Sequence, residues 1–427
     1  MAQHIAERLQ APGPKRILSL DGGGTRGIVT IAFLERIEAK LRAQFDRDDM
    51  TLSDYFDLIG GTSVGSLLAT MLALGWETKQ VRETFQTWAP QLFNQTFTGG
   101  GYDGRVLFNK LRGLLGTMTL GADDLKTGLA VLAKRSDTNS VWVLVNNPNS
   151  RFYRSVGQRI GNGEYLLRDI LRAATAAPTY YSPVDLQIHR ERPGGNGAEE
   201  VVREGRFIDG AVSPHNNPAL RLFKLARLRG HNLGGAPVEA VLENPANGRA
   251  WDYGPENLLL ISCGAGSFAS NVQSSRIPYK EAANALVSMI GDAEQFVLAT
   301  MQAMSVSPRA AFNEPYKNWH IDRDVGDLIA DQVFGAPMLT FQRYDLRLEE
   351  EWLLGQGGGL VAGERVQDAI KIARIRLSKD LKQLQDLINL KAMKKLDALA
   401  RAAAEEQVNE RDFPSAFNQV WNPAVAV

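Results

Sequence analysis

The chain has 427 residues, of which 44% are hydrophobic and 22% are charged, and its 48 basic residues equal its 48 acidic residues. This composition indicates a globular protein with a large core, and the balanced charge gives no support to the binding of a nucleic-acid polymer. A single cysteine, Cys263, excludes an internal disulfide and fits a reducing compartment.

The amino-terminal sequence indicates the cellular location of the protein. The segment MAQHIAERLQ has charges where a signal peptide needs an apolar core, and no run of about 18 apolar residues occurs. We therefore expect a cytoplasmic protein without a membrane-spanning segment.

Two strand–turn–helix units are predicted near the amino terminus. Residues 16–20 form an apolar run that ends in the stretch DGGGTRG at 21–27, as a buried parallel strand would. After it, four apolar residues recur every four positions and indicate one face of a helix: Val29, Phe33, Ile37 and Leu41. Residues 55–74 repeat the scheme, with a helix that is apolar nearly all round and belongs in the interior.

Further strands are predicted downstream. Residues 128–137 and 140–147 form two strands joined by a turn, and 207–212 and 257–267 are strands that enter loops. Strands that alternate with helices predict an α/β fold with a mainly parallel sheet. The polar, glycine-containing stretch 190–206 is interpreted as a surface insertion.

The carboxyl-terminal part is predicted to be helical. The stretch GQGGG at 355–359 marks a boundary, and beyond it four apolar residues are spaced by four, three and four positions: Leu377, Leu381, Leu384 and Ile388. Segment 365–395 holds nine basic and three acidic residues, a local net charge of +6 (9 − 3). Two interpretations are open: a solvated helix face, or a helix that docks on an anionic surface or ligand.

The glycine-rich stretch has three interpretations. Gly22, Gly24 and Gly27 match G-x-G-x-x-G, but the next strand lacks the acidic residue that a dinucleotide fold places on the ribose. LSLDGGGT also looks like the first phosphate loop of actin-fold sugar kinases, yet that loop is a hairpin turn and the residues after it here have a helical period. The third interpretation is a loop whose N–H groups face the oxyanion of a reacting ester.

A second motif favours the oxyanion loop. GTSVG at 61–65 fits G-x-S-x-G, a sharp strand-to-helix turn that exposes a nucleophilic serine. The crowded backbone of this nucleophile elbow needs small neighbours, and Gly61 and Gly65 supply them around Ser63.

A serine nucleophile needs a base, and no histidine lies in a sequence context typical of a catalytic loop. His215 and His320 are candidates, although an ordinary surface or hydrogen-bonded role is the plainer interpretation of each. Asp209 ends an apolar run and precedes glycine, which by itself indicates a solvated turn. The adjacent cluster SPHNNP at 213–218 indicates a positioned acid instead, and a buried carboxylate with a raised pKa can act as a base.

Together the motifs resemble a known family. DGGGTRG at 21–27, GTSVG at 61–65 and DGA at 209–211 are similar, in that order, to the three signatures of patatin-like phospholipases. ATAAPTYYSPV at 174–184 and NNP at 216–218 look like further family segments. The resemblance implies a three-layer α/β fold with a mainly parallel central sheet, and a Ser–Asp dyad that works without histidine.

The resemblance also implies residue roles. Ser63 is the nucleophile, Asp209 is the proton acceptor, and the oxyanion hole is formed by Gly22, Gly23 and Gly24. Arg26 lies near the substrate phosphate or pairs within its own loop, and Asp21 and Gly27 shape the turn. No metal or other cofactor is expected for the chemistry, because no cluster has ligand spacing.

The predicted organisation has three parts: a patatin-like catalytic core at 15–221, the remainder of the α/β body at 222–350, and a short helical extension at 351–427. Aromatic residues within 88–97 and the pair Tyr180–Tyr181 are expected at the entrance for an acyl chain or in ordinary core packing.

A narrower resemblance concerns regulation. DLKTGLAVLAKRSDTNSVWVLVNNP, FQRYDLRLEEEWL and AAAEEQVNERDFPSAF look like segments of bacterial antiphage effectors in which a cyclic dinucleotide switches on membrane degradation. It implies hydrolysis of membrane phospholipids at the inner membrane surface, activation by a cyclic dinucleotide, and self-association on activation. The alternatives are an unregulated lipid acyl hydrolase or esterase, a catalytically idle ligand-sensing scaffold, and the sugar kinase.

Overall fold

The computed structural model describes residues 3–93, 102–150, 152–157, 159–178, 180–191, 199–227, 251–268, 278–309, 334–356 and 362–421. Within these ranges the strands are β1 (Lys15–Leu20), β2 (Leu58–Thr62), β3 (Gly128–Arg135), β4 (Ser140–Val145), β5 (Val184–Glu191), β6 (Glu199–Asp209), β7 (Leu258–Cys263), β8 (Ser305–Val306) and β9 (Leu339–Tyr344).

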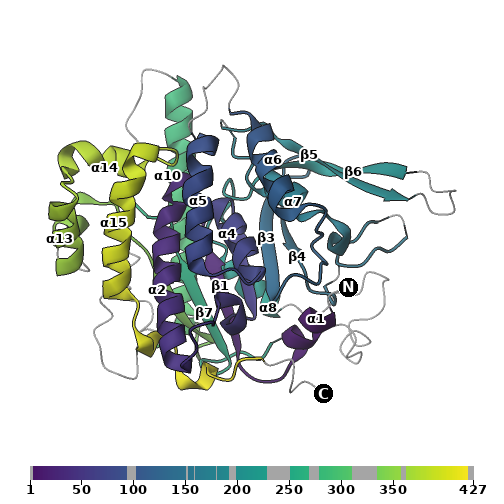
Figure 1. Cartoon of the computed structure of the whole chain (residues 1–427), viewed down its shortest axis with the longest axis horizontal. Helices are drawn as coiled ribbons and strands as arrows, with labels where there is room; N and C mark the ends of the chain where they lie inside the picture. Colours follow the sequence, from purple (N-terminus) through teal and green to yellow (C-terminus); the bar gives the residue numbers. More distant parts are fainter. Residues whose placement is uncertain are drawn as a thin grey trace.

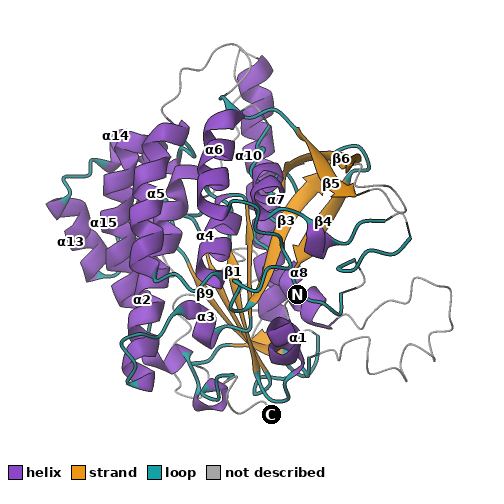
Figure 2. Cartoon of the chain, turned by 45° about the vertical axis from the view of Figure 1, so that its right-hand side comes forward, coloured by secondary structure: helices purple, strands orange, loops and turns teal. Residues whose placement is uncertain are grey.

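The described helices are α1 (Gln3–Gln10), α2 (Gly27–Phe45), α3 (Leu52–Tyr55), α4 (Val64–Ala73), α5 (Thr78–Phe93), α6 (Gly104–Leu115), α7 (Leu167–Ala174), α8 (Ala219–Arg227), α10 (Pro278–Ala303), α12 (Glu350–Leu353), α13 (Glu364–Ile372), α14 (Leu377–Gln385) and α15 (Leu390–Gln407). Most of them flank one central sheet (Figures 1 and 2).

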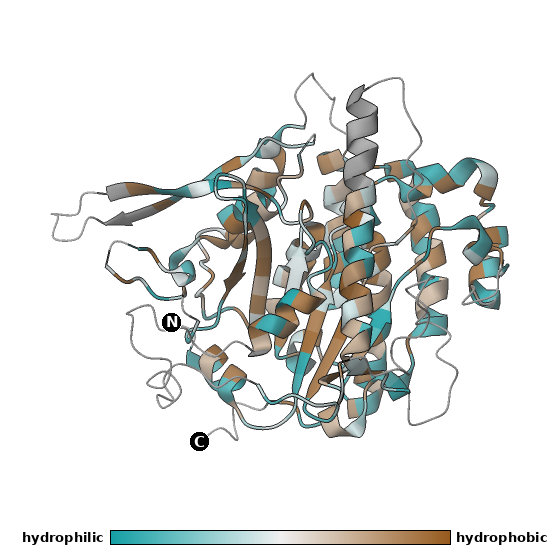
Figure 3. Cartoon of the chain, turned by 180° about the vertical axis from the view of Figure 1, so that it is seen from behind, coloured by the Kyte–Doolittle hydropathy of each residue, from teal (hydrophilic) through white to brown (hydrophobic). Residues whose placement is uncertain are grey.

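The sheet is mainly parallel, as the alternation of strands and helices predicts. Its order is β5–β6–β3–β2–β1–β7–β9–β8, with β4 paired to β3. Strands β1, β2, β3, β7, β8 and β9 form parallel pairs, whereas β4 and β6 pair with β3 in the antiparallel sense. The strands in the centre are strongly hydrophobic (Figure 3), as strands covered on both faces must be.

Successive residues of each central strand face opposite helix layers, which makes the fold three-layered. In β1, Leu18 and Leu20 belong to the core under α2, α4 and α5, whereas Ile17 belongs to the core under α8 and α10. On the first side α15 packs against α2 and adds an outer helix, beside α13 and α14 (Figure 1). The carboxyl-terminal helices therefore pack directly on the α/β body.

The polar stretch 190–206, predicted as a surface insertion, contains strand residues that the sequence did not predict. Residues 199–206 belong to β6 and pair with β5 in a long antiparallel hairpin, which projects from the body (Figure 1). A projecting antiparallel hairpin can be solvated on its faces, so it does not need the apolar run by which buried strands are found in a sequence.

Candidate active site

The site is built where β2 and β6 meet end to end. Strand β2 pairs with residues 128–132 of β3, and β6 pairs with the next three residues, 133–135, in the opposite direction. Because β4 occupies the other edge of β3, β2 and β6 share one edge and approach each other head to head. Their last residues, Thr62 and Asp209, thus bring Ser63 next to the Asp209 carboxylate.

The serine lies on a strained turn. Ser63 has φ 53° and ψ −128° and stands between the end of β2 and the start of α4. A side chain at Gly61 would collide with the backbone of Gly65, and one at Gly65 would collide with the carbonyl of Leu20. These close approaches explain the glycines of the motif, since a β-carbon at either position would force the elbow apart.

Ser63 donates a hydrogen bond to Asp209. The distance from Ser63 Oγ to Asp209 Oδ2 is 2.6 Å, and Asp209 Oδ1 accepts a 2.8 Å bond from the N–H of Ala211. Burial of the carboxyl raises the pKa of Asp209 to about 6, although both hydrogen bonds act to lower it. The pair therefore combines a hydroxyl with a carboxylate of unusual basicity.

The glycine loop lies against this pair. A side chain at Gly22 would collide with Asn216, and its β-carbon would lie 3.1 Å from that of Ser63. The N–H of Gly22 donates to the carbonyl of Asn216 at 3.2 Å. Among the described residues, the N–H groups of Gly23 and Gly24 have no hydrogen-bond partner, so these two are the donors that remain available to a ligand.

A buried ion cluster supports the start of the same loop. Arg343, at the end of β9, donates from Nη2 to Asp21 at 2.6 Å, to Glu294 of α10 at 2.7 Å and to Asp345 at 3.0 Å, and from Nη1 to Ser262 at 2.8 Å. Burial is the main cause that raises the pKa of both Asp21 and Glu294. Asp21, expected only to shape the turn, is thus part of a long-range network that the local sequence does not reveal.

Arg26 points into the site from the end of the glycine loop. Its Nη1 donates to the carbonyl of Gly266 at 2.9 Å, its guanidinium lies 5.2 Å from the ring centre of Phe268, and its buried Nε has no partner in the described part of the chain. The expected pairing within its own loop is therefore not what holds this side chain. Burial lowers the pKa of Arg26.

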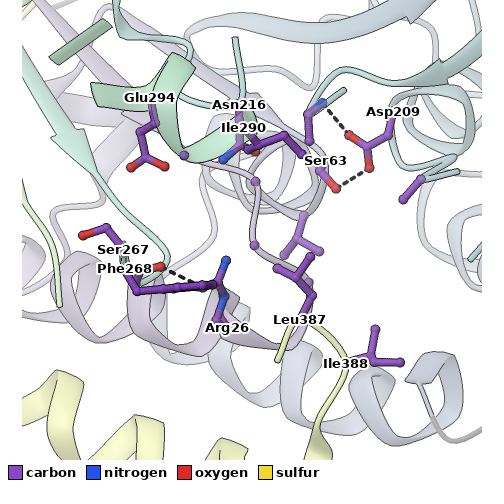
Figure 4. A pocket seen from close by; sticks show the side chains of 18 of the residues that line it. Arg26, Ser63, Asp209, Asn216, Ser267, Phe268, Ile290, Glu294, Leu387 and Ile388 are labelled. Carbon is purple, nitrogen blue, oxygen red and sulfur yellow. Dashed lines mark hydrogen bonds between the residues drawn. The ribbon is translucent and has the colours of Figure 1, made fainter. Parts of the chain in front are cut away.

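These groups line one cavity of about 280 Å³. Figure 4 shows the dyad on one side of it and Arg26 and Glu294 on the other. Apolar lining comes from α4, α5, α6 and the segment after α7: Val64, Leu67, Leu92, Phe93, Leu107, Tyr180 and Tyr181. The cavity therefore offers an apolar wall, a serine with a base, and charged side chains, which suits an amphipathic ester.

The link between α14 and α15 closes the cavity below the glycine loop. Leu387 and Ile388 line it, and Figure 4 shows both below Ser63. The carbonyl of Leu387 accepts bonds from the N–H of Thr25 at 2.7 Å and from its hydroxyl at 3.1 Å. No sequence motif pointed to this contact, because it joins residues 362 positions apart.

Among the described residues, the ring of the candidate His215 makes no hydrogen bond to Ser63 or Asp209. The carbonyl of His215 accepts a 2.7 Å bond from the hydroxyl of Thr62. Its buried ring Nδ1 has no hydrogen-bond partner among the residues that the structure describes, and burial lowers the pKa of the ring to about 4. His320 lies outside the described residues. In the described part of the chain, no group of three or more His, Cys, Asp or Glu residues could hold a metal ion, and no helix is long and apolar enough to cross a membrane.

Fold and site define an α/β protein with a serine on a nucleophile elbow that is hydrogen-bonded to a buried aspartate. The family model "Patatin-like phospholipase" matches residues 18–223, which contain the glycine loop, the elbow and Asp209. Residues 18–223 are therefore similar to the patatin-like phospholipase family.

Curated relatives show the same similarity. The chain is 28% identical over 271 residues to Patatin-17 of Solanum cardiophyllum and 28% identical over 270 residues to Patatin-03 of Solanum tuberosum. Each match covers 59% of this chain and 60% of the relative. The chain thus spans about 60% of the length of these relatives.

Solved structures with similarity to the chain include VipD from Legionella pneumophila, with a TM-score of 0.27 and 9% identity over 91% of this chain and 67% of that one. They also include human GIVD cytosolic phospholipase A2, with a TM-score of 0.39 and 13% identity over 95% of this chain and 60% of that one.

Proposed function

We propose that the protein is a phospholipase of the A type, which hydrolyses acyl ester bonds of membrane phospholipids with Ser63 as nucleophile and Asp209 as base. The observation that carries the proposal is the 2.6 Å hydrogen bond from Ser63 Oγ to Asp209 Oδ2, inside a cavity with both apolar and charged lining. The similarity of residues 18–223 to the family model "Patatin-like phospholipase" supports the substrate class.

The reaction has two halves. Ser63 Oγ attacks the acyl carbonyl carbon while Asp209 takes the hydroxyl proton, and the N–H groups of Gly23 and Gly24 stabilise the oxyanion. The intermediate collapses, the bond to the lysophospholipid oxygen breaks, and Asp209 returns the proton to that oxygen. Water then attacks the acyl-enzyme, with Asp209 as base, and releases the fatty acid and free Ser63.

Arg26 is proposed to bind the substrate phosphate. Its guanidinium lines the cavity opposite the dyad (Figure 4), and among the described residues its side chain donates only from Nη1, to the carbonyl of Gly266. A planar guanidinium suits phosphate better than an ammonium does. Arg26→Lys should therefore lower hydrolysis of phospholipid more than hydrolysis of a neutral p-nitrophenyl ester, and equal losses on both would assign Arg26 to the structure of the loop.

Regulation is the second part of the proposal. We propose that the enzyme acts at the inner membrane surface and is switched on by a cyclic dinucleotide, with self-association on activation, as the resemblance to bacterial antiphage effectors suggests. A ligand shifts a resting enzyme to an active one only if it binds the active state more tightly.

The test is fatty-acid release from phospholipid vesicles, measured by mass spectrometry with and without a panel of cyclic di- and trinucleotides. Hydrolysis that depends on Ser63 supports the phospholipase assignment, and its absence under all conditions contradicts it. A fast rate that no nucleotide changes contradicts the regulatory part alone.

A further inference from the structure

The helices α13, α14 and α15 carry a group of exposed cations. Three basic residues of this region are paired: Arg365 with Glu405, Lys371 with Asp368, and Lys395 with Asp380. Six others are exposed and have no ion-pair partner among the described residues: Arg374, Arg376, Lys379, Lys382, Lys391 and Lys394. We call these six the basic surface.

The four lysines lie on the outward sides of two consecutive helices. In α14, Leu377 and Leu384 are buried, and Lys379 and Lys382, three residues apart, lie on the opposite side of the helix. In α15, Leu396 and Leu399 are buried, along with Ala392, Ala400 and Ala403. Lys391 and Lys394 repeat the three-residue spacing on the exposed side.

The basic surface is joined to the cavity through the connection between α14 and α15. Leu387 and Ile388 line the cavity and lie in the connection between α14 and α15. Lys382 lies five residues before Leu387, and Lys391 lies three residues after Ile388. The carbonyl of Leu387 also fixes this connection to Thr25 of the glycine loop. The same segment thus presents cations to solvent and an apolar wall to the active site.

We propose that the basic surface binds the anionic headgroups of a lipid bilayer and sets the cavity against the membrane, an inference whose choice of partner rests on the proposed phospholipase function. The six side chains are exposed and spread over α14, α15 and the connection that precedes α14, which suits an extended anionic surface rather than a small enclosed ligand. Ile372, 82% exposed at the end of α13, supplies an apolar side chain beside these charges, as interfacial helices do.

The test uses the full chain with Ser63→Ala, so that vesicles stay intact during binding. Co-sedimentation is compared between phosphatidylcholine vesicles and vesicles that also contain phosphatidylglycerol. We expect binding to the anionic vesicles only, weakened by raised salt. Each basic residue near such a surface contributes about fivefold in affinity, so Lys379→Glu/Lys382→Glu should bind about 30-fold more weakly or worse.

The matched control is Lys79→Glu/Lys224→Glu, which makes the same charge change at two exposed lysines of α5 and α8. It should bind anionic vesicles within about twofold of the parent, because binding depends on charges that face the bilayer and not on the net charge of the protein. Equal losses in both double variants, or equal binding to neutral vesicles, would overturn the proposal.

A second readout separates this inference from the phospholipase assignment. With Ser63 restored, Lys379→Glu/Lys382→Glu should lose hydrolysis of anionic vesicles and keep hydrolysis of a soluble p-nitrophenyl ester. If the variant binds vesicles normally but no longer responds to a cyclic dinucleotide, the basic surface is a ligand site and the membrane proposal is wrong. If the parent hydrolyses neither vesicles nor the soluble ester, the proposed function is contradicted, and the vesicle-binding experiment still tests the basic surface.

Discussion

The dyad and the ion cluster each hold a buried aspartate beside the glycine loop, but the two carboxyls have different partners. Asp209 accepts bonds from neutral donors, the hydroxyl of Ser63 and the N–H of Ala211. Asp21 is bonded to Arg343, which also binds Glu294 and Asp345. Burial raises the pKa of both aspartates.

The difference fits the proposed role of Asp209 as a proton acceptor and a structural role for Asp21. A carboxylate that is desolvated and lacks a cation keeps its basicity and lies in contact with a hydroxyl that can give up its proton. A carboxyl bound to a buried arginine is held in position, and its loss leaves the other charges uncompensated. Loss of a dyad residue should therefore lower activity without lowering stability, whereas loss of the cation of the cluster should lower stability.

The largest effect is expected at Ser63. Ser63→Ala removes the nucleophile and should lower ester hydrolysis about 10⁴-fold or more, while the unfolding temperature stays close to that of the parent. Because the two residues act as one unit, Ser63→Ala/Asp209→Ala should be little worse than Ser63→Ala alone. A much lower unfolding temperature for Ser63→Ala would indicate a structural role for Ser63 and would contradict the difference proposed between the dyad and the ion cluster.

Arg343 should show the opposite pattern. Arg343→Met leaves the carboxyls of Asp21, Glu294 and Asp345 without their common cation, and should lower the free energy of unfolding by about 3–5 kcal/mol. The control is Arg105→Met, which removes an exposed ion pair with Asp103 and should leave the free energy of unfolding nearly unchanged. The free energies of unfolding of both variants are measured by urea unfolding, monitored by circular dichroism. Equal values for Arg343→Met and Arg105→Met would contradict the structural role of the cluster.

The pH dependence of activity tests the environment of Asp209. Its pKa of about 6 means that the base is protonated below pH 6, so kcat/KM on a neutral soluble ester should fall about tenfold per pH unit below that value. A break near pH 4 instead would match an unperturbed carboxyl or the His215 ring, whose pKa is about 4.

The contribution of Asp209 to stability should fall as pH rises, whereas activity should rise. The folded state binds the Asp209 proton more tightly than the unfolded state, because its pKa is raised from 3.8 to about 6. This contribution to stability therefore decreases as pH rises from about 4 to about 6, and the buried charge costs about 3 kcal/mol above that range. Asp209→Asn should unfold at a higher temperature than the parent at pH 7, and should lose this advantage at pH 4.

The smallest effect is expected at His215. His215→Ala should keep hydrolysis within about tenfold of the parent, because a residue that performs proton transfer contributes about 10²–10⁴-fold. The contact that matters here is made by its backbone carbonyl with Thr62, which the substitution preserves. A loss as deep as that of Ser63→Ala would indicate a base other than Asp209.

The parts of the site that the sequence predicted are those encoded by neighbouring residues. The elbow needs small residues two positions either side of Ser63, so Gly61 and Gly65 reveal it locally. The strands and helices around it follow from apolar periodicity, and the mainly parallel sheet follows from their alternation. Asp209 was found because a turn cluster surrounds it.

The parts that were not predicted depend on long-range contacts between residues that have no local motif. Asp21 and Arg343 are 322 positions apart, and Thr25 and Leu387 are 362 positions apart. Gly22 looked equivalent to Gly23 and Gly24, but its N–H faces the carbonyl of Asn216, a pairing that only the folded arrangement of the two segments determines. The β5–β6 hairpin was missed because solvated strands lack the apolar run of buried ones.

Asp209→Asn gives the most direct test of the central claim, that a buried aspartate without histidine activates Ser63. The amide keeps the shape of the side chain and can still accept a hydrogen bond from Ser63, but it cannot take the proton. The measurement is the initial rate of fatty-acid release from phospholipid vesicles at pH 7, beside the parent and Ser63→Ala. We predict a rate at least about 10³-fold below the parent, close to that of Ser63→Ala. A rate within about tenfold of the parent would contradict the assignment of Asp209 as the base.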